Sequence, residues 1–117
     1  MNEDILYQLF DRPEIGSAKH LVEEYAFTLE GIPETVRLRV YQALAGKLYE
    51  FEQRHYLQPP GHPEPLMADT DQYVSAEEAL RECVELFIEG YQKAHHNGHP
   101  PDSNWLLPNR DFSGPAD

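Results

Sequence analysis

The sequence contains a single cysteine, few basic residues and no long apolar run. Cys83 has no second cysteine with which to form an internal disulfide, and this favours a reducing compartment. No apolar stretch approaches the ~20 residues that a membrane-spanning helix needs. The N-terminal segment, MNEDILYQLF, places two acidic residues where a secretory signal has a basic region. We therefore expect a cytoplasmic protein that does not associate with membranes.

Basic residues are scarce relative to acidic ones. The chain has 9 Lys and Arg residues against 21 Asp and Glu, which gives a formal net charge of −12. Such a protein lacks the basic face that displaces counterions from nucleic acid, and anionic membrane surfaces repel it. We therefore expect no direct nucleic-acid binding. The acidity either favours a partner protein with a basic surface or serves solubility alone, and both interpretations stay open.

The recognised catalytic motifs are also missing. The sequence has no glycine-rich phosphate loop, no nucleophile elbow and no zincin motif. Cys83 lies among Leu80, Val84 and Phe87 on the apolar side of a predicted helix. There we expect a thiol with a raised pKa that behaves as a small core residue. The sequence therefore predicts a protein that is not an enzyme and that needs no cofactor.

The residues that are present are sufficient for one compact domain. Hydrophobic residues make up 40% of the 117 positions, including 7 Tyr, 5 Phe and 1 Trp. Their spacing predicts an all-α fold, a small helical bundle of three principal helices and a short N-terminal helix. The helices are expected over residues 2–13, 17–30, 33–57 and 75–95. We expect the bundle to span residues 1–99 and an irregular aromatic tail, 100–117, to pack on it.

The segment 33–57 is predicted to be the central helix. An apolar stripe runs along it, formed by Val36, Val40, Ala43, Leu44, Leu48 and Phe51. Further apolar residues widen this stripe over most of the circumference, so the helix must be covered on more than one side. A second copy of the chain could supply that cover. A homodimer and a monomer are therefore both compatible with the sequence.

A long proline-rich loop separates this segment from the last predicted helix. That helix begins with a capping box, Ser75 followed by Glu78. Opposite its apolar face lies an acidic row formed by Glu78, Glu82, Glu85 and Glu89. Such a row is typical of a solvated surface. It could also bind a basic groove, or imitate the regular negative charge of nucleic acid.

Three histidines, His95, His96 and His99, lie where the last helical pattern ends. Imidazoles bind zinc, copper or nickel, but a structural zinc site needs four ligands with a recognisable spacing. Basic residues also favour helix C-termini, and Asn97-Gly98 provides a left-handed exit. We therefore interpret the cluster as a helix ending, with metal binding as the weaker alternative.

Together these features predict a non-catalytic protein-binding module that acts as a regulator, adaptor or accessory subunit. The expected contact surfaces are an off-pattern patch of Phe27 and His20, the acidic row, and the tail residues Trp105, Leu106, Leu107 and Phe112. One alternative is an acidic mimic of nucleic acid that inhibits a nucleic-acid-binding protein. The other is a metal-binding helical protein that uses the histidine cluster.

Overall fold

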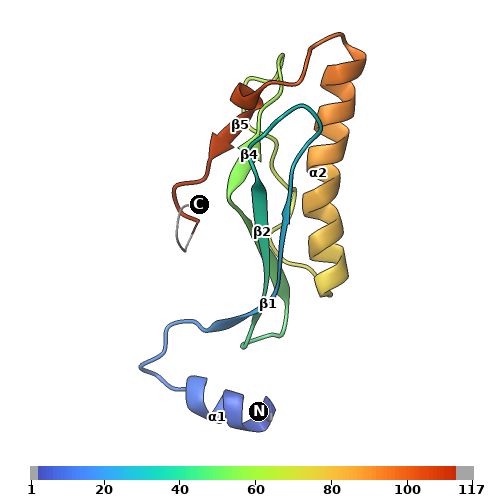
Figure 1. Cartoon of the computed structure of the whole chain (residues 1–117). Helices are drawn as coiled ribbons and strands as arrows, with labels where there is room; N and C mark the ends of the chain where they lie inside the picture. Colours follow the sequence, from blue (N-terminus) through green and yellow to red (C-terminus); the bar gives the residue numbers. More distant parts are fainter. Residues whose placement is uncertain (1–2, 113–117) are drawn as a thin grey trace.

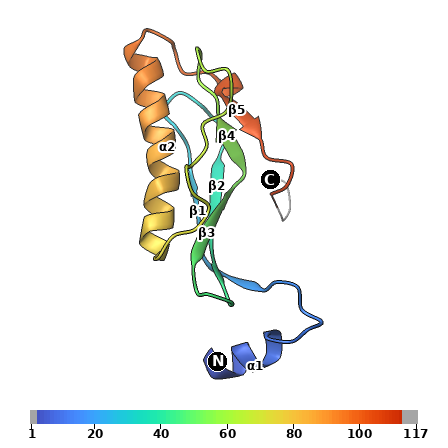
Figure 2. The ribbon, with the colours of Figure 1, turned by 180° about the vertical axis from the view of Figure 1, so that it is seen from behind.

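The computed structural model describes residues 3–112, which form an α+β fold (Figures 1 and 2). In chain order the elements are α1 (Glu3–Phe10), β1 (Lys19–Phe27), β2 (Val36–Ala43), β3 (Tyr49–Gln53), β4 (His55–Leu57), α2 (Ala76–His96), the 3-10 helix η1 (Ser103–Trp105) and β5 (Leu106–Pro108). The predicted all-α bundle of three principal helices is therefore wrong. Only the last of those three helices forms, and two antiparallel sheets replace the others.

The first sheet has the strand order β1-β2-β3, with both pairs antiparallel. Strand β4 follows β3 directly after Arg54 and pairs with β5 in a second, two-stranded sheet. Helix α2 packs along one face of β2, β3 and β4 (Figures 1 and 2). The other face of the three-stranded sheet carries no helix in either view.

Strand β2 forms because its side chains alternate between the two faces of the sheet. Val36, Leu38 and Val40 are fully buried on the α2 side, whereas Arg37 and Arg39 lie between them and are half-buried.

The prediction of a helix over 33–57 is wrong. The alternation of apolar and polar residues in β2 is short, and some of its apolar positions also fit the spacing of a helix. Positions 36, 40 and 44 satisfy both a period of two and a helical stripe.

The turn between β2 and β3 also excludes a continuous helix over 33–57. Gly46 has a φ of 84° and Lys47 a φ of 58°, both in the left-handed region. They lie in the four-residue loop 44–47 of a β-hairpin, where such residues let the chain reverse its direction. The Ala43 N–H donates to the Leu48 carbonyl at 2.9 Å and closes the hairpin. In the sequence, Gly46 was the one residue of this segment that pointed to a turn.

The helix predicted over residues 17–30 is wrong as well, because Lys19–Phe27 is the edge strand β1. It runs antiparallel to β2, with Tyr25 opposite Leu38 and a bulge between Leu21 and Glu23. Phe27, predicted to project from a helix, lies half-buried with its ring edge-to-face against Phe87, the centroids 5.5 Å apart. This contact connects β1 to the core beneath α2.

Helix α2 confirms the predicted fourth helix and its N-terminal cap. The Ser75 hydroxyl accepts a hydrogen bond from the Glu78 N–H at 3.1 Å. Ala79, Cys83 and Phe87 recur every four residues and are all buried against the sheet. At the other end Gly98 has a φ of 87°, which is the left-handed exit that Asn97-Gly98 predicted.

The C-terminal residues complete the core and are not wholly irregular. Trp105 at the end of η1 and Leu106 in β5 are buried, 2% and 6% exposed. The Gln58 N–H donates to the Trp105 carbonyl at 2.7 Å, which joins this segment to the end of β4. The predicted irregular tail is therefore corrected, because residues 103–108 form a helical turn and a strand that pairs with β4.

Helix α1 confirms the predicted N-terminal helix, although its predicted cap, Asn2, lies outside the described residues. Both views show α1 at one end of the molecule, away from α2 and the sheets (Figures 1 and 2). The molecule is accordingly elongated, with extents of 54 × 27 × 24 Å. Within residues 3–112 no helix combines the length and apolarity needed to cross a membrane.

Replacing Phe87 by alanine should lower the free energy of unfolding by about 3–5 kcal/mol, because it leaves a cavity where the ring now packs. Equilibrium urea denaturation followed by circular dichroism measures this loss. The matched variant Glu85→Ala, at an exposed position of the same helix, should change the value by no more than about 0.5 kcal/mol. Equal effects of the two changes would contradict the packing of α2 on the sheet.

Candidate protein-binding cleft

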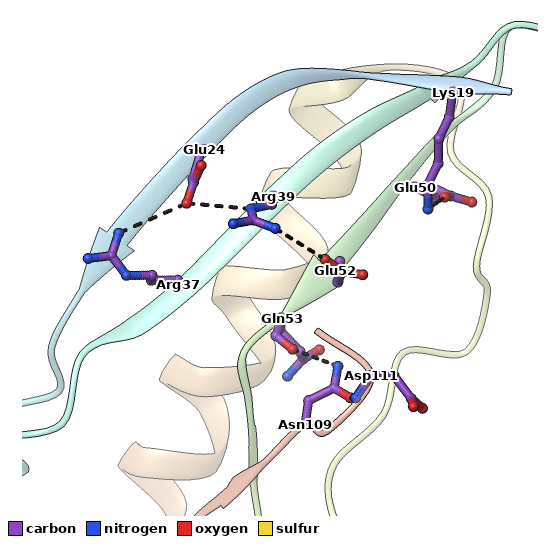
Figure 3. A network of polar contacts seen from close by, with 9 residues as sticks. All are labelled: Lys19, Glu24, Arg37, Arg39, Glu50, Glu52, Gln53, Asn109 and Asp111. Atoms are coloured by element: carbon purple, nitrogen blue, oxygen red, sulfur yellow. Dashed lines mark hydrogen bonds and ion pairs between the residues drawn. The ribbon is translucent and has the colours of Figure 1, made fainter. Parts of the chain in front are cut away.

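The open face of the three-stranded sheet carries a row of alternating charges (Figure 3). Antiparallel pairing sets Glu24 and Glu52 on either side of Arg39. The Arg39 guanidinium lies 3.5 Å from the Glu24 carboxylate and 3.8 Å from that of Glu52. Arg37 lies 3.9 Å from the same Glu24 carboxylate. Charges of opposite sign therefore balance one another across the centre of this face.

The last described residues cover part of the same face. The Phe112 ring lies over the Arg39 guanidinium, 4.4 Å from ring centroid to central carbon, in a cation–π arrangement. The Asn109 amide donates to the Gln53 carbonyl at 2.8 Å (Figure 3). The C-terminal segment thus closes one end of the open face.

Beside this row, at the edge of β3, lies a cleft of about 630 Å³. It is lined by Lys19, Glu50, Phe51, Glu52, Gln53, Tyr56, Met67, Ala68, Asp69, Thr70, Asp71 and Asn109. The proline-rich loop between β4 and α2, called here the proline-rich connection (residues 58–74), forms its far wall. That connection meets the end of β4 at Leu66, whose N–H donates to the Leu57 carbonyl. It meets β3 at Tyr73, which bridges to Tyr49. Between these two anchors residues 67–71 line the cleft.

The cleft is strongly acidic. Glu50 and Glu52 come from β3, Asp69 and Asp71 come from the loop, and Lys19 is the one basic residue among the lining residues. Four carboxylates and one ammonium give a formal charge of −3. The Lys19 Nζ lies 2.7 Å from a Glu50 carboxylate oxygen, and this hydrogen bond raises the pKa of Lys19. Asp69 and Asp71 are exposed.

The edge of β3 also brings backbone groups to the cleft. The N–H and carbonyl of Tyr49 point away from β2, because they bond to Tyr73 at 2.8 Å. In a strand the direction of these groups repeats every second residue. The peptide groups of Phe51, two residues on and among the lining residues, therefore point to the cleft. They provide a donor and an acceptor for an extended segment.

These groups suit the binding of a positively charged side chain of a peptide. Carboxylates accept charge-assisted hydrogen bonds from lysine ammonium and arginine guanidinium groups. Tyr56 and Met67 add apolar surface along which the long stems of those side chains can lie. The arrangement therefore favours recognition of a basic, extended peptide.

The predicted acidic row on α2 stays a separate surface. Glu78, Glu85 and Glu89 are exposed and Glu82 is half-buried. None of the four lines the cleft. The cleft and the helix are thus two separate acidic surfaces, and the sequence pattern indicated the one on the helix.

The other predicted contact residues do not come together. Trp105 and Leu106 are buried in the core, and Leu107 is half-buried in β5. His20 is exposed on β1, whereas Phe27 contacts Phe87. Phe112 lies over Arg39 at the open face of the sheet. These residues therefore do not form one common surface.

The predicted histidine cluster lies at the exposed end of α2. The His95 ring stacks on Tyr91 with the centroids 6.0 Å apart, and His96 and His99 are exposed. Within residues 3–112 no three His, Cys, Asp or Glu side chains group closely enough to hold a metal ion. Burial raises the pKa of Cys83 to about 12, which confirms the predicted core thiol.

The cleft has no direct signal in the sequence. Its strand residues follow a two-residue alternation, Glu50 and Glu52, within the segment assigned to a helix. Its loop residues, Asp69 and Asp71, show the same spacing in the proline-rich connection. Each pair was visible as a short acidic repeat, but only the fold places the two pairs on opposite walls of one cleft.

No known protein family, curated protein or solved structure matches this chain.

Tyr73 should make the stability of the fold depend on pH above 10. Burial, and to a lesser extent nearby acidic residues, raise its pKa from 10 to about 12, and its hydroxyl donates to the Thr70 carbonyl at 3.0 Å. Because the folded state disfavours ionisation, this stabilisation is complete below pH 10 and is lost as the pH rises through 12.

Urea denaturation at a series of pH values tests this, with Tyr73→Phe as the reference. We expect the variant to be about 1 kcal/mol less stable at neutral pH, because it lacks the hydrogen bond. The difference between the two proteins should shrink from pH 10 upward. A difference that stays constant to pH 12 would show that Tyr73 ionises as readily in the folded chain as in the unfolded one.

Proposed function

We propose that this protein is a non-catalytic binding module that takes up a basic, extended segment of another protein in the cleft beside β3. The observation that carries the proposal is the cleft itself, whose lining includes four carboxylates and one lysine at the edge of β3. The net charge of −12 agrees with it, because a strongly acidic protein attracts basic partners over long range.

The distribution of charge favours the cleft over the rest of the open face. Across β1 and β2 the acidic and basic side chains pair, as between Glu24 and Arg39 at 3.5 Å. A ligand that bound there would have to compete with these existing pairs. In the cleft Glu50 and Glu52 are paired likewise, with Lys19 and Arg39. Asp69 and Asp71, however, are exposed on the loop, so they can bind an incoming ammonium or guanidinium group with little rearrangement.

The strand edge adds a second reason to expect a peptide. An extended segment that forms hydrogen bonds with an open edge gains affinity from its main chain, whereas pockets for its side chains determine specificity. Here the Phe51 peptide groups provide the edge, and the carboxylates on both sides provide the pockets. Basic residues at alternate positions of the ligand would point toward the same wall.

The experiment is a selection of random dodecapeptides displayed on phage, with the purified full chain as target. We expect the enriched peptides to carry two or more Lys or Arg residues. Fluorescence anisotropy with one such labelled peptide should then show a dissociation constant that rises with salt, because exposed charges are screened beyond ~10 Å at 0.1 M. The double variant Asp69→Asn/Asp71→Asn should weaken binding about tenfold or more.

The matched control is Glu85→Gln/Glu89→Gln, which removes the same charge from exposed positions on α2. It should leave the peptide affinity nearly unchanged. If the α2 variant abolishes binding and the loop variant does not, the site is the acidic row, which is the result expected of a nucleic-acid mimic. Enriched peptides without basic residues would contradict the proposal altogether.

A further inference from the structure

Helix α1 exposes the apolar residues that should be covered in a stable helix. It has eight residues, Glu3–Phe10, and an isolated helix shorter than ~12–15 residues is marginal in water. Ile5, Leu9 and Phe10 remain 40–49% exposed, and both views place α1 away from α2 and the sheets (Figures 1 and 2). A further surface must therefore pack on this helix for it to persist.

Strand β1 also leaves apolar side chains uncovered. It lies at the edge of the sheet beyond the strands on which α2 packs. Tyr25 is 41% exposed and lies opposite the buried Leu38, so it points to the same side of the sheet as α2. Ile88 of α2, 45% exposed, borders a hollow near the end of β1 together with Thr28 and Leu29. Helix α2 therefore contacts β1 at Phe27 but leaves Tyr25 exposed.

We propose that two copies of this chain form a dimer by exchanging these N-terminal helices. The α1 helix of each copy would pack on the partner's β1, beside α2, where it would cover Tyr25 and Ile88. This single two-fold contact covers both apolar surfaces of both chains. A different protein bound at β1 would leave α1 uncovered.

The dimensions of the chain agree with this exchange. The connection between α1 and β1, residues 11–18, can span up to ~26 Å when extended, so the helix can reach a second molecule.

The edge strand itself is poorly suited to direct strand pairing between copies. A bulge interrupts β1 between Leu21 and Glu23, and Lys19, Glu23 and Glu24 add charges. Bulges and charged residues are the usual means by which an edge strand avoids pairing with another. Side-chain packing of a helix on β1 needs no pairing of backbone groups, and the Glu23 carboxylate beside Tyr25 already accepts a hydrogen bond from the Tyr25 hydroxyl at 2.7 Å. The occupant that we propose is therefore the helix.

Sedimentation velocity over a concentration series tests the dimer with the full chain. We expect a reversible monomer–dimer equilibrium, in which Leu9→Ser raises the dissociation constant about tenfold or more because a buried leucine side chain is lost. Gln8→Ser, at an exposed polar position of the same helix, is the matched control and should leave the constant nearly unchanged. A monomer at every concentration, or equal effects of the two variants, would contradict the exchange.

Disulfide trapping distinguishes exchange between chains from folding back within one chain. Leu9→Cys and Tyr25→Cys are made separately, with different tags, and are mixed under mild oxidation. Cys83 is fully buried and should not compete. The mixture should give a covalent heterodimer, and Ile88→Cys serves as a second acceptor position. If neither acceptor gives a heterodimer, or if the double variant Leu9→Cys/Tyr25→Cys closes within single chains, the exchange does not occur.

The dimer and the proposed peptide binding can fail independently. Two chains that each carry a net charge of −12 repel one another, so added salt should strengthen the dimer. The same salt should weaken the binding of a basic peptide. Asp69→Asn/Asp71→Asn should leave the dimer at least as tight as that of the wild type, because these residues lie in the cleft and not beside β1 or α1.

Discussion

A single helix packs on a sheet that is wider than the helix can cover, and the other features of the molecule follow from this constraint. Helix α2 covers the inner face of β2 through Val36, Leu38 and Val40, all fully buried. Phe87 supplies the large side chain at the centre of this contact, and Phe27 joins it from β1. Such burial of apolar area is the main favourable term in folding.

The parts of the sheet that α2 does not cover make other contacts. On the outer face the strands carry charges that pair across the sheet, and the Phe112 ring lies over the Arg39 guanidinium. The proline-rich connection returns to the sheets at two places, to β4 through Leu66 and to β3 through Tyr73. The cleft forms between these two returns, so its position depends on the loop anchors as much as on β3.

The sequence predicted those elements whose signals are local. The cap at Ser75, the two-faced pattern of α2, the left-handed exit at Gly98 and the buried thiol of Cys83 all depend on residues within a few turns of one another. Strand β2 depends on pairing partners at residues 19–27 and 49–53, which a local pattern does not contain. Its apolar residues at 36 and 40 satisfied helical spacing equally well.

The candidate site was missed for the same reason. Glu50 and Glu52 read as one turn of helix surface, and Asp69 and Asp71 read as part of a polar loop. Only the hairpin at Gly46 and the bridge between Tyr49 and Tyr73 bring the two acidic pairs to one cleft. The spacing of the residues along the sequence does not show that the two acidic pairs meet in one cleft.

The most direct test of this account is the pattern of backbone nuclear Overhauser effects in the uniformly labelled protein. The account predicts long-range cross-strand contacts that connect Leu38 with Tyr25 on one side and with Gln53 on the other, together with helical contacts over residues 76–96. Helical contacts between residues three apart throughout 33–57, without the cross-strand ones, would contradict the packing of one helix on a three-stranded sheet.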